Sequence, residues 1–230
     1  MSRAAKTRAV VFDLDGTLLD SLPLVLQAIA HAIEPFGPVP PTMEIFAHLG
    51  GPPERFLPGL LGDARHVPEA MERMDEYHQT HQHLIRPFDG VGAALAELRA
   101  RGVALAIWTG RDRESSEALL RTYQLAGQFA VVVCGDDLPT HKPDPQGLRE
   151  ILARLDVPAA ETIFVGDADV DVLGGVACGV DTLLIHHGRA VDEALRAKAW
   201  RTVASPPEAY ALVLRCVAPA GSRDCRSGLT

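Results

Sequence analysis

Residues 10–21 read VVFDLDGTLLDS, and this stretch decides how the rest of the sequence is interpreted. Three apolar residues, typical of a buried strand, run directly into Asp13 and Asp15, and Gly16 follows. An ionised carboxylate that is buried without a partner is costly, and two carboxylates close together repel each other. The segment is therefore either an exposed turn or the place where a cation is held.

The composition indicates a folded chain of ordinary character. It has 230 residues, 47% of them hydrophobic, which predicts one large core with an insertion, or two small domains. The net charge of -8 argues against a nucleic-acid partner, because such surfaces depend on clustered Lys and Arg. No apolar run approaches the roughly 18–20 residues of a membrane span, and the stretch after MSRAAKTR is too short for a signal peptide. We expect a cytoplasmic monomer or homodimer without a membrane partner.

Five short runs rich in Val and Ile alternate with helical patterns. They are AVVFD at 9–13, ALAIWT at 104–109, AVVVCG at 130–135, TIFVGD at 162–167 and DTLLIH at 181–186. This alternation predicts a doubly wound, Rossmann-like α/β fold, in which helices cover both faces of a parallel sheet. Several runs end in a polar residue, among them Asp13, Thr109 and Asp167. These side chains should converge, because ligands bind beyond the carboxyl ends of such strands.

Residues 21–87 interrupt the alternation with helical patterns and a segment rich in Pro and Gly. We interpret them as an inserted helical cap, residues 1–20 and 88–216 as the core, and residues 217–230 as a flexible tail. Apolar residues at helical spacing predict core helices within 90–102, where Gly102 is a plausible C-cap, and within 144–157.

The polar residues near the strand ends are of the types expected in a magnesium-dependent phosphoryl-transfer site. Mg²⁺ prefers hard oxygen ligands, which Asp13, Asp167 and a backbone carbonyl could supply. A carboxylate in line with a phosphate can attack phosphorus, so Asp13 is the candidate nucleophile. Asp15 would protonate the leaving oxygen and later activate water.

Substrate binding is expected from the residues that follow two other segments of the core. Thr109 and the Gly110 amide could donate hydrogen bonds to phosphoryl oxygens, and Arg111 is a candidate substrate ligand, although an arginine in an ion pair is an equal alternative. Lys142, in HKPDP, would neutralise developing charge and restrain the nucleophile.

Four ordered motifs give the chain a resemblance to the haloacid dehalogenase superfamily of phosphatases. They are FDLDGTLLD, a hydrophobic residue followed by Thr-Gly-Arg, Lys-Pro-Asp-Pro, and VGDADVD, and the resemblance covers residues from about 9 to 212. It implies that Asp13 is the nucleophile, Asp15 the acid/base and Asp167 a metal ligand, with Asp171 a ligand or a residue that holds water. The expected metal set is Asp13, Asp15, Asp167 and Asp171, and the expected cofactor is Mg²⁺.

The helical insertion is similar to that of the small-cap subfamily, which includes phosphoglycolate phosphatases. The resemblance implies hydrolysis of a small phosphorylated metabolite, either phosphoglycolate-like or a sugar phosphate, through an aspartyl-phosphate. Asp15 argues against a dehalogenase, and the absence of lysine from the cap argues against phosphonate cleavage. A sugar phosphotransferase or phosphomutase, and a catalytically idle binding protein, stay open as alternatives.

Each candidate also has a plainer interpretation. Thr109 and Asp167 could each cap the following helix, Lys142 could be a solvated loop lysine, and Asp171 could be a surface acid. In the cap, three residues are candidates for contacting the leaving group, because Gly50 and Gly51 would let a backbone loop approach the site closely, although a solvated loop explains each of them singly. They are His48, Arg55 and Arg65.

Overall fold

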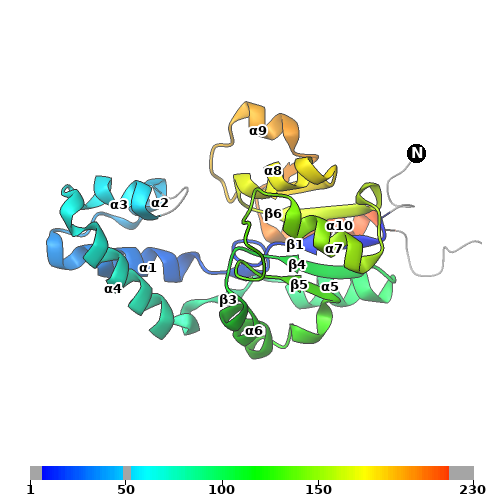
Figure 1. Cartoon of the computed structure of the whole chain (residues 1–230), viewed down its shortest axis with the longest axis horizontal. Helices are drawn as coiled ribbons and strands as arrows, with labels where there is room; N and C mark the ends of the chain where they lie inside the picture. Colours follow the sequence, from blue (N-terminus) through cyan, green and yellow to red (C-terminus); the bar gives the residue numbers. More distant parts are fainter. Residues whose placement is uncertain (1–6, 49–52, 218–230) are drawn as a thin grey trace, which may run out of the picture. The chain divides into compact units, whose positions relative to one another are not determined.

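The computed structural model describes residues 7–48 and 53–217 (Figure 1). The chain forms two compact units, Met1–Leu19 with Pro87–Thr230, and Asp20–Arg86. It passes between them at two short strands, β2 (Leu19–Asp20) and β3 (Arg86–Pro87), which pair as a two-stranded sheet. The expected tail beyond residue 217 and the glycines at 50 and 51 lie outside the described residues.

The first unit contains a six-stranded sheet in the order β5-β4-β1-β6-β7-β8, and every pairing in it is parallel. The strands are β1 (Ala9–Phe12), β4 (Ala104–Trp108), β5 (Val131–Val133), β6 (Thr162–Gly166), β7 (Asp181–Ile185) and β8 (Arg201–Val203). The predicted α/β fold is confirmed. The chain builds outward from β1 to β5 on one side and then from β6 to β8 on the other, so the strand order reverses at β1.

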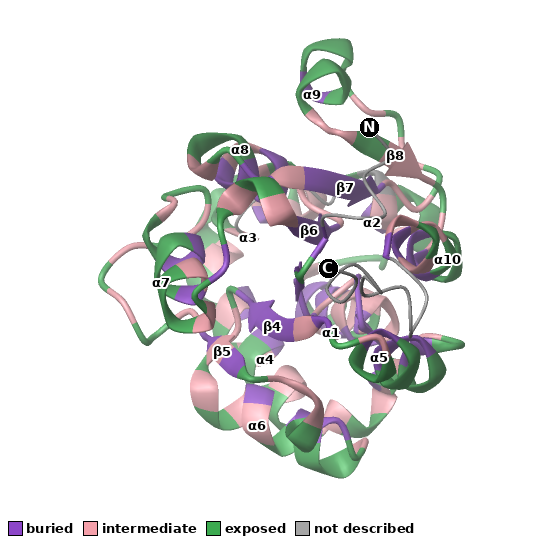
Figure 2. Cartoon of the chain, turned by 90° about the vertical axis from the view of Figure 1, so that its right-hand side faces the viewer, coloured by how far each residue is buried: buried purple, intermediate pink, exposed green. Residues whose placement is uncertain are grey.

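Helices cover both faces of this sheet, α5 and α10 on one face and α7 and α8 on the other (Figure 2). The helices of this unit are α5 (Val91–Ala100), α6 (Arg113–Thr122), α7 (Gln146–Leu155), α8 (Asp169–Cys178), α9 (Glu193–Lys198) and α10 (Pro206–Cys216), with short 3-10 helices η5 (Ala126–Gln128) and η6 (Ala159–Glu161). The central strand β1 is fully buried, which explains its continuous apolar sequence. The helices are buried on one stripe only, as their apolar spacing predicts.

The buried residues under α7 hold the three central strands, whose ends carry the candidate site residues. Leu148 and Ile151 of α7 pack on Val11, Trp108 and Phe164 of the three central strands, and all of them are buried. The face of α7 is therefore anchored against the strands whose ends carry the candidate residues. Gly102, which has a φ of 77°, follows α5 as the sequence predicts.

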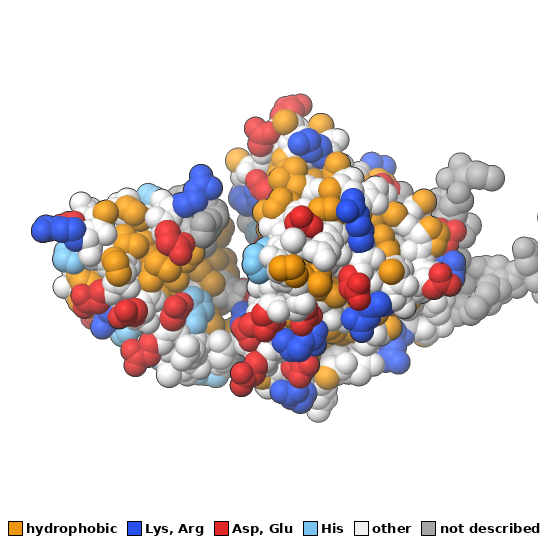
Figure 3. Space-filling model, viewed as in Figure 1, with side chains coloured by type: hydrophobic (Ala, Val, Ile, Leu, Met, Phe, Trp, Pro, Cys, Tyr) orange, Lys and Arg blue, Asp and Glu red, His pale blue; other side chains and the backbone are white. Residues whose placement is uncertain are grey.

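The second unit is helical. Its elements are α1 (Leu22–Ile33), η2 (Glu34–Phe36), α2 (Thr42–His48), α3 (Pro53–Leu61), η3 (Ala64–His66), α4 (Val67–Thr80) and η4 (Gln82–Leu84). Ile29 and Ile33 of α1 share a buried cluster with Leu57 of α3 and Met74 of α4, so this unit has a core of its own. On the face in Figure 3, acidic and basic side chains lie close together on each unit. None of the helices in the described ranges is long and apolar enough to cross a membrane.

Candidate active site

The candidate residues lie where the central strands end. The Asp13 N–H donates to the carbonyl of Val165 in β6 at 2.8 Å, and the Thr109 N–H donates to the carbonyl of Val133 in β5 at 3.0 Å. Both residues therefore continue the hydrogen bonding of the sheet one step beyond the strands. Asp167 directly follows β6. These three positions flank the reversal of strand order at β1, which is where open α/β sheets bind ligands.

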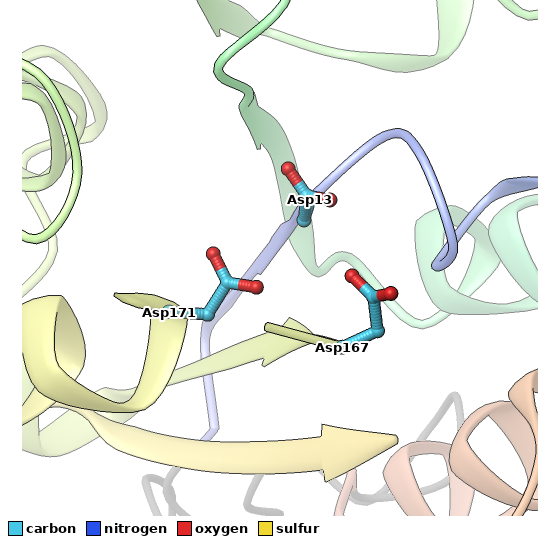
Figure 4. Close-up of side chains that lie close together, drawn as sticks. All are labelled: Asp13, Asp167 and Asp171. Atoms are coloured by element: carbon cyan, nitrogen blue, oxygen red, sulfur yellow. The ribbon is translucent and has the colours of Figure 1, made fainter. Parts of the chain in front are cut away.

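Three carboxylates converge at this edge. Asp13, Asp167 and Asp171 offer oxygens that lie within 4.8 Å of one another (Figure 4). Asp13 is 7% exposed and Asp171 only 1%, so the interpretation of Asp171 as a surface acid is wrong. The N-cap of α8 is Ala168, so the interpretation of Asp167 as that cap is wrong as well.

Lys142 supplies a positive charge inside this cluster. Its Nζ donates to Asp13 Oδ1 at 2.7 Å and to Asp171 Oδ1 at 2.8 Å. The ammonium also lies over the rings of Trp108, at 5.1 Å, and Phe164, at 5.4 Å. Burial by itself would lower the pKa of Lys142, but the charges and hydrogen bonds of the two aspartates raise it above its ordinary value. The lysine is charged and buried, and the interpretation of a solvated loop lysine is wrong.

Asp171 is engaged by the protein through both carboxylate oxygens. Oδ1 accepts from Lys142, and Oδ2 accepts from the backbone N–H of Ala168 at 2.9 Å. This second bond ties the first turn of α8 to the loop after β6. Asp171 therefore positions both Lys142 and the loop that carries Asp167.

Asp13 and Asp167 are not compensated in this way. Asp13 Oδ2 and both oxygens of Asp167 accept no hydrogen bond from the described part of the chain. Burial, outweighing the opposing charge of Lys142, raises the pKa of Asp13 to about 7. Burial and the neighbouring charge of Asp13 raise the pKa of Asp167 well above its ordinary value. Three carboxylates facing one ammonium leave unbalanced negative charge, and free carboxylate oxygens are the ligands of a hard divalent cation, so this donor set fits Mg²⁺.

Gly16 gives the loop after β1 a close approach to Asp167. Its φ is +71°, and a Cβ at this position would lie 2.1 Å from Asp167 Oδ2. Any side chain here would collide with the carboxylate and would also strain the backbone. The glycine in the first motif is therefore required by the position of Asp167, the residue that follows β6.

Two residues that follow β7, which no motif in the sequence marks, also contact the loops of this site. His187 Nε2 donates to the Gly16 carbonyl at 2.7 Å and lies 4.0 Å from Asp167 Oδ2. Arg189 donates to the backbone carbonyl of Asp167 at 3.0 Å and pairs with Asp169 at 2.6 Å. These two residues hold the loops after β1 and β6. The same rule of polar strand ends that picked out Asp13 would have found them in HHGR.

Asp15 lies apart from the three carboxylates and pairs with Arg111. Arg111 Nε donates to Asp15 Oδ2 at 2.8 Å, and Nη2 donates to Asp15 Oδ1 at 2.7 Å. The Thr109 hydroxyl accepts from the Arg111 N–H at 3.1 Å. The N-cap of α6 is Asp112, whose carboxylate accepts from the Ser115 N–H, so the interpretation of Thr109 as that cap is wrong.

The candidate residues of the second unit have local partners or are exposed. His48 Nδ1 bonds the Glu44 carbonyl at 2.8 Å, and Arg65 pairs with Asp63 at 2.6 Å. Arg55 is exposed on α3. Their contact with a substrate stays a prediction.

Comparison with known proteins identifies the family. The model of the haloacid dehalogenase-like hydrolases matches residues 10–185. The chain therefore belongs to the haloacid dehalogenase-like hydrolase family, as its motifs predict.

Curated relatives cover most of the chain. It is 34% identical over 193 residues to the plasmid phosphoglycolate phosphatase of Cupriavidus necator, covering 79% of this chain and 82% of the relative. It is 33% identical over 183 residues to the pyrophosphatase PpaX of Halalkalibacterium halodurans, covering 76% and 82%. The fold is shared with a crystal structure described as a predicted phosphoglycolate phosphatase from Haemophilus somnus, at a TM-score of 0.76 and 19% identity, covering 91% of this chain and 99% of that one. The predicted enzyme class, a phosphatase of this family, is confirmed.

Proposed function

We propose that the protein hydrolyses small phosphomonoesters through an aspartyl-phosphate on Asp13, with Mg²⁺ as its cofactor. The observation that carries the proposal is the arrangement around Asp13. One of its oxygens is held by a buried lysine, and the other accepts no hydrogen bond from the described residues. Such a carboxylate is oriented and has an oxygen available for attack on phosphorus.

Asp13 and Asp167 would hold the metal, because their oxygens lie together and, apart from the bond from Lys142 to Asp13 Oδ1, accept no hydrogen bonds from the described residues. Bound Mg²⁺ would supply positive charge that binds and polarises the phosphoryl group. Asp171 would support these two metal ligands indirectly, because it binds Lys142 and the loop that carries Asp167. The predicted metal role of Asp15 would use its backbone carbonyl, because both of its carboxylate oxygens are bound to Arg111.

The residues of the site would have different roles in the two steps, formation and hydrolysis of the aspartyl-phosphate. Asp13 attacks phosphorus, the bond to the leaving oxygen breaks, and Asp15 gives that oxygen a proton. Asp15 then takes a proton from the water that attacks the aspartyl-phosphate, which releases inorganic phosphate and restores Asp13. Thr109 and the Gly110 amide would donate hydrogen bonds to the phosphoryl oxygens. Lys142 balances the charge that develops on Asp13 and the phosphoryl group.

The helical unit, residues 21–87 in our assignment, would act as a cap that selects the leaving group. His48, Arg55 and Arg65 are its candidate contacts. A cap that closes excludes water from the core chemistry and sets specificity. Among substrates we favour a phosphoglycolate-like ester, because similar proteins that the chain matches over 82% and 73% of their length carry that name.

The test is a panel of small phosphate esters with wild type, Asp13→Asn and Asp169→Asn proteins at millimolar Mg²⁺, followed by release of inorganic phosphate. Asp169 belongs to the same motif but is exposed and pairs with Arg189, so its variant is the matched control. We expect wild type and Asp169→Asn to release phosphate and Asp13→Asn to be inactive. Transfer of the phosphoryl group to a sugar without release of phosphate would favour the phosphotransferase alternative. Turnover of every ester by Asp13→Asn at the wild-type rate would refute the nucleophile.

A further inference from the structure

Arg111 and Asp15 bind each other, so in this structure Arg111 is not placed as a substrate ligand and Asp15 is not placed to protonate a leaving oxygen. Two parallel hydrogen bonds, at 2.7 and 2.8 Å, join the guanidinium to both oxygens of the carboxylate. The Arg111 side chain is 16% exposed and that of Asp15 is 31% exposed, so the pair is partly removed from water. In this state both oxygens of Asp15 accept a hydrogen bond from Arg111, and the Nε and Nη2 donors of Arg111 that form one parallel pair are used.

The geometry of the pair also shows what could displace Asp15. A guanidinium with two parallel donors matches the two oxygens of a carboxylate, and such bidentate pairs are specific for this shape. Asp15 is the residue expected to meet the leaving oxygen. A carboxylate on the leaving group would therefore arrive beside the site where Arg111 already holds one.

We propose that Arg111 is a specificity-determining residue that exchanges partners, releasing Asp15 and binding a carboxylate on the leaving group of the substrate. The substrate class is a phosphomonoester that carries a carboxylate one carbon from the ester oxygen. Binding of such a substrate frees Asp15 for the leaving oxygen, whereas an ester with a neutral leaving group leaves the pair intact. This inference rests on the proposed function and goes beyond it by assigning the recognition to one residue of the core.

The first experiment measures binding without turnover. Asp13→Asn protein with Mg²⁺ is titrated by calorimetry with 2-phosphoglycolate and with 2-hydroxyethyl phosphate, whose leaving group is neutral and of similar length. Adding Arg111→Gln should weaken binding of phosphoglycolate about tenfold to hundredfold, because a charge-assisted pair is lost. Binding of hydroxyethyl phosphate should change by less than about threefold.

The matched control is Arg113→Gln. Arg113 lies two residues further along, is 40% exposed, and pairs with Asp137 and Glu117 rather than with Asp15. This variant should keep the preference of the parent protein. Arg111→Lys retains the charge but loses the two parallel donors, so it should fall between the parent and Arg111→Gln, and its melting temperature reports whether the fold persists.

A second variant changes binding in the opposite direction. Replacing Asp15 by Asn in the same background removes the competitor for Arg111 before the ligand arrives. Phosphoglycolate should then gain more affinity than hydroxyethyl phosphate, by about two- to fivefold, which is the strength of a partly exposed ion pair. A purely structural role for the pair would predict a loss of affinity for both ligands.

Three outcomes would overturn the exchange. Equal weakening of both ligands by Arg111→Gln would show that Arg111 binds the phosphoryl group. No weakening would show that its pair with Asp15 persists in the complex. Weaker binding of phosphoglycolate on Asp15→Asn would show that the aspartate supports rather than competes. If Asp13→Asn protein binds neither ligand and wild type hydrolyses no ester, the proposed function itself fails. This result can be distinguished from the three outcomes that overturn only the exchange.

Discussion

Replacing Asp13 by Asn should stabilise the metal-free protein at alkaline pH while abolishing turnover. Burial raises the pKa of Asp13 from 3.8 to about 7. Between these two values the folded protein binds a proton that the unfolded chain has lost, so stability falls as the pH rises through this window. Asn keeps an oxygen that accepts from Lys142, and it carries no charge at any pH.

The expected magnitude follows from the shift. The change from 3.8 to about 7 corresponds to at most about 4 kcal/mol of stability lost by wild type across the window, at about 1.4 kcal/mol for each pH unit. Near pH 4.5 the Asn variant and wild type should therefore melt at similar temperatures. Above pH 7 the variant should melt higher, by up to about 16 °C for a chain of this size at about 2–4 °C per kcal/mol.

The assay is thermal unfolding of EDTA-treated protein at several pH values from 4.5 to 8, repeated with Mg²⁺. The metal should raise the melting temperature of wild type more than that of the variant, because binding to the folded state stabilises it by about 2.7 kcal/mol at a hundredfold excess over Kd. Asp169→Asn removes a charge from an exposed side chain of the same motif and should show no gap that depends on pH. A variant that is less stable than wild type at pH 8, or a gap that is constant with pH, would refute the reasoning.

Three further substitutions test the surroundings of the cluster. Gly16→Ala places a methyl group against the Asp167 carboxylate at a positive φ, so we expect the free energy of unfolding to fall by about 1–2 kcal/mol from backbone strain and nearly all turnover to be lost. The control is Gly62→Ala, at a φ of +70° in open space, which should lose stability only. Lys142→Met leaves the buried carboxylates uncompensated, so its free energy of unfolding should fall by about 3–5 kcal/mol at pH 8 and by less at pH 5, where Asp13 is protonated. Thermal unfolding at both pH values measures this, and an equal loss at both would contradict it. Tyr210→Phe removes a buried hydrogen bond of 2.6 Å to a backbone carbonyl in the loop after β1, and calorimetry should show a loss of about 1–3 kcal/mol with the affinity for Mg²⁺ unchanged.

The parallel sheet could be predicted from the sequence because its strands are buried on both faces. Five runs of Val and Ile mark β1, β4, β5, β6 and β7, since a strand without a solvent face needs no polar alternation. Strand β8 was missed because it is not buried on both faces. Its sequence, Arg201–Val203, is short, lies at the edge and is at most half-buried, so it lacks the apolar run that identifies the others.

The partners of the site residues could not be predicted, because they depend on tertiary contacts between distant segments. Asp171 was identified as a candidate from its spacing in the fourth motif. Its double engagement, however, requires the first turn of α8 to lie against the loop of Lys142. The aromatic rings beneath Lys142 come from β4 and β6 and are likewise brought together only by the sheet.

The divergence of Asp13 and Asp15 shows where the reasoning from sequence reaches its limit. In an extended strand, residues i and i+2 point to the same face, so a strand that continued through DLD would direct both carboxylates to one side. The strand ends at Phe12, and beyond Asp13 the chain turns, with the Gly16 N–H bonded to the carbonyl of Leu19. The alternation no longer holds there, and the two carboxylates receive different counter-charges, Lys142 for Asp13 and Arg111 for Asp15. Two identical side chains, two residues apart, are therefore held by separate partners from different segments of the chain, which the sequence of the first motif does not reveal.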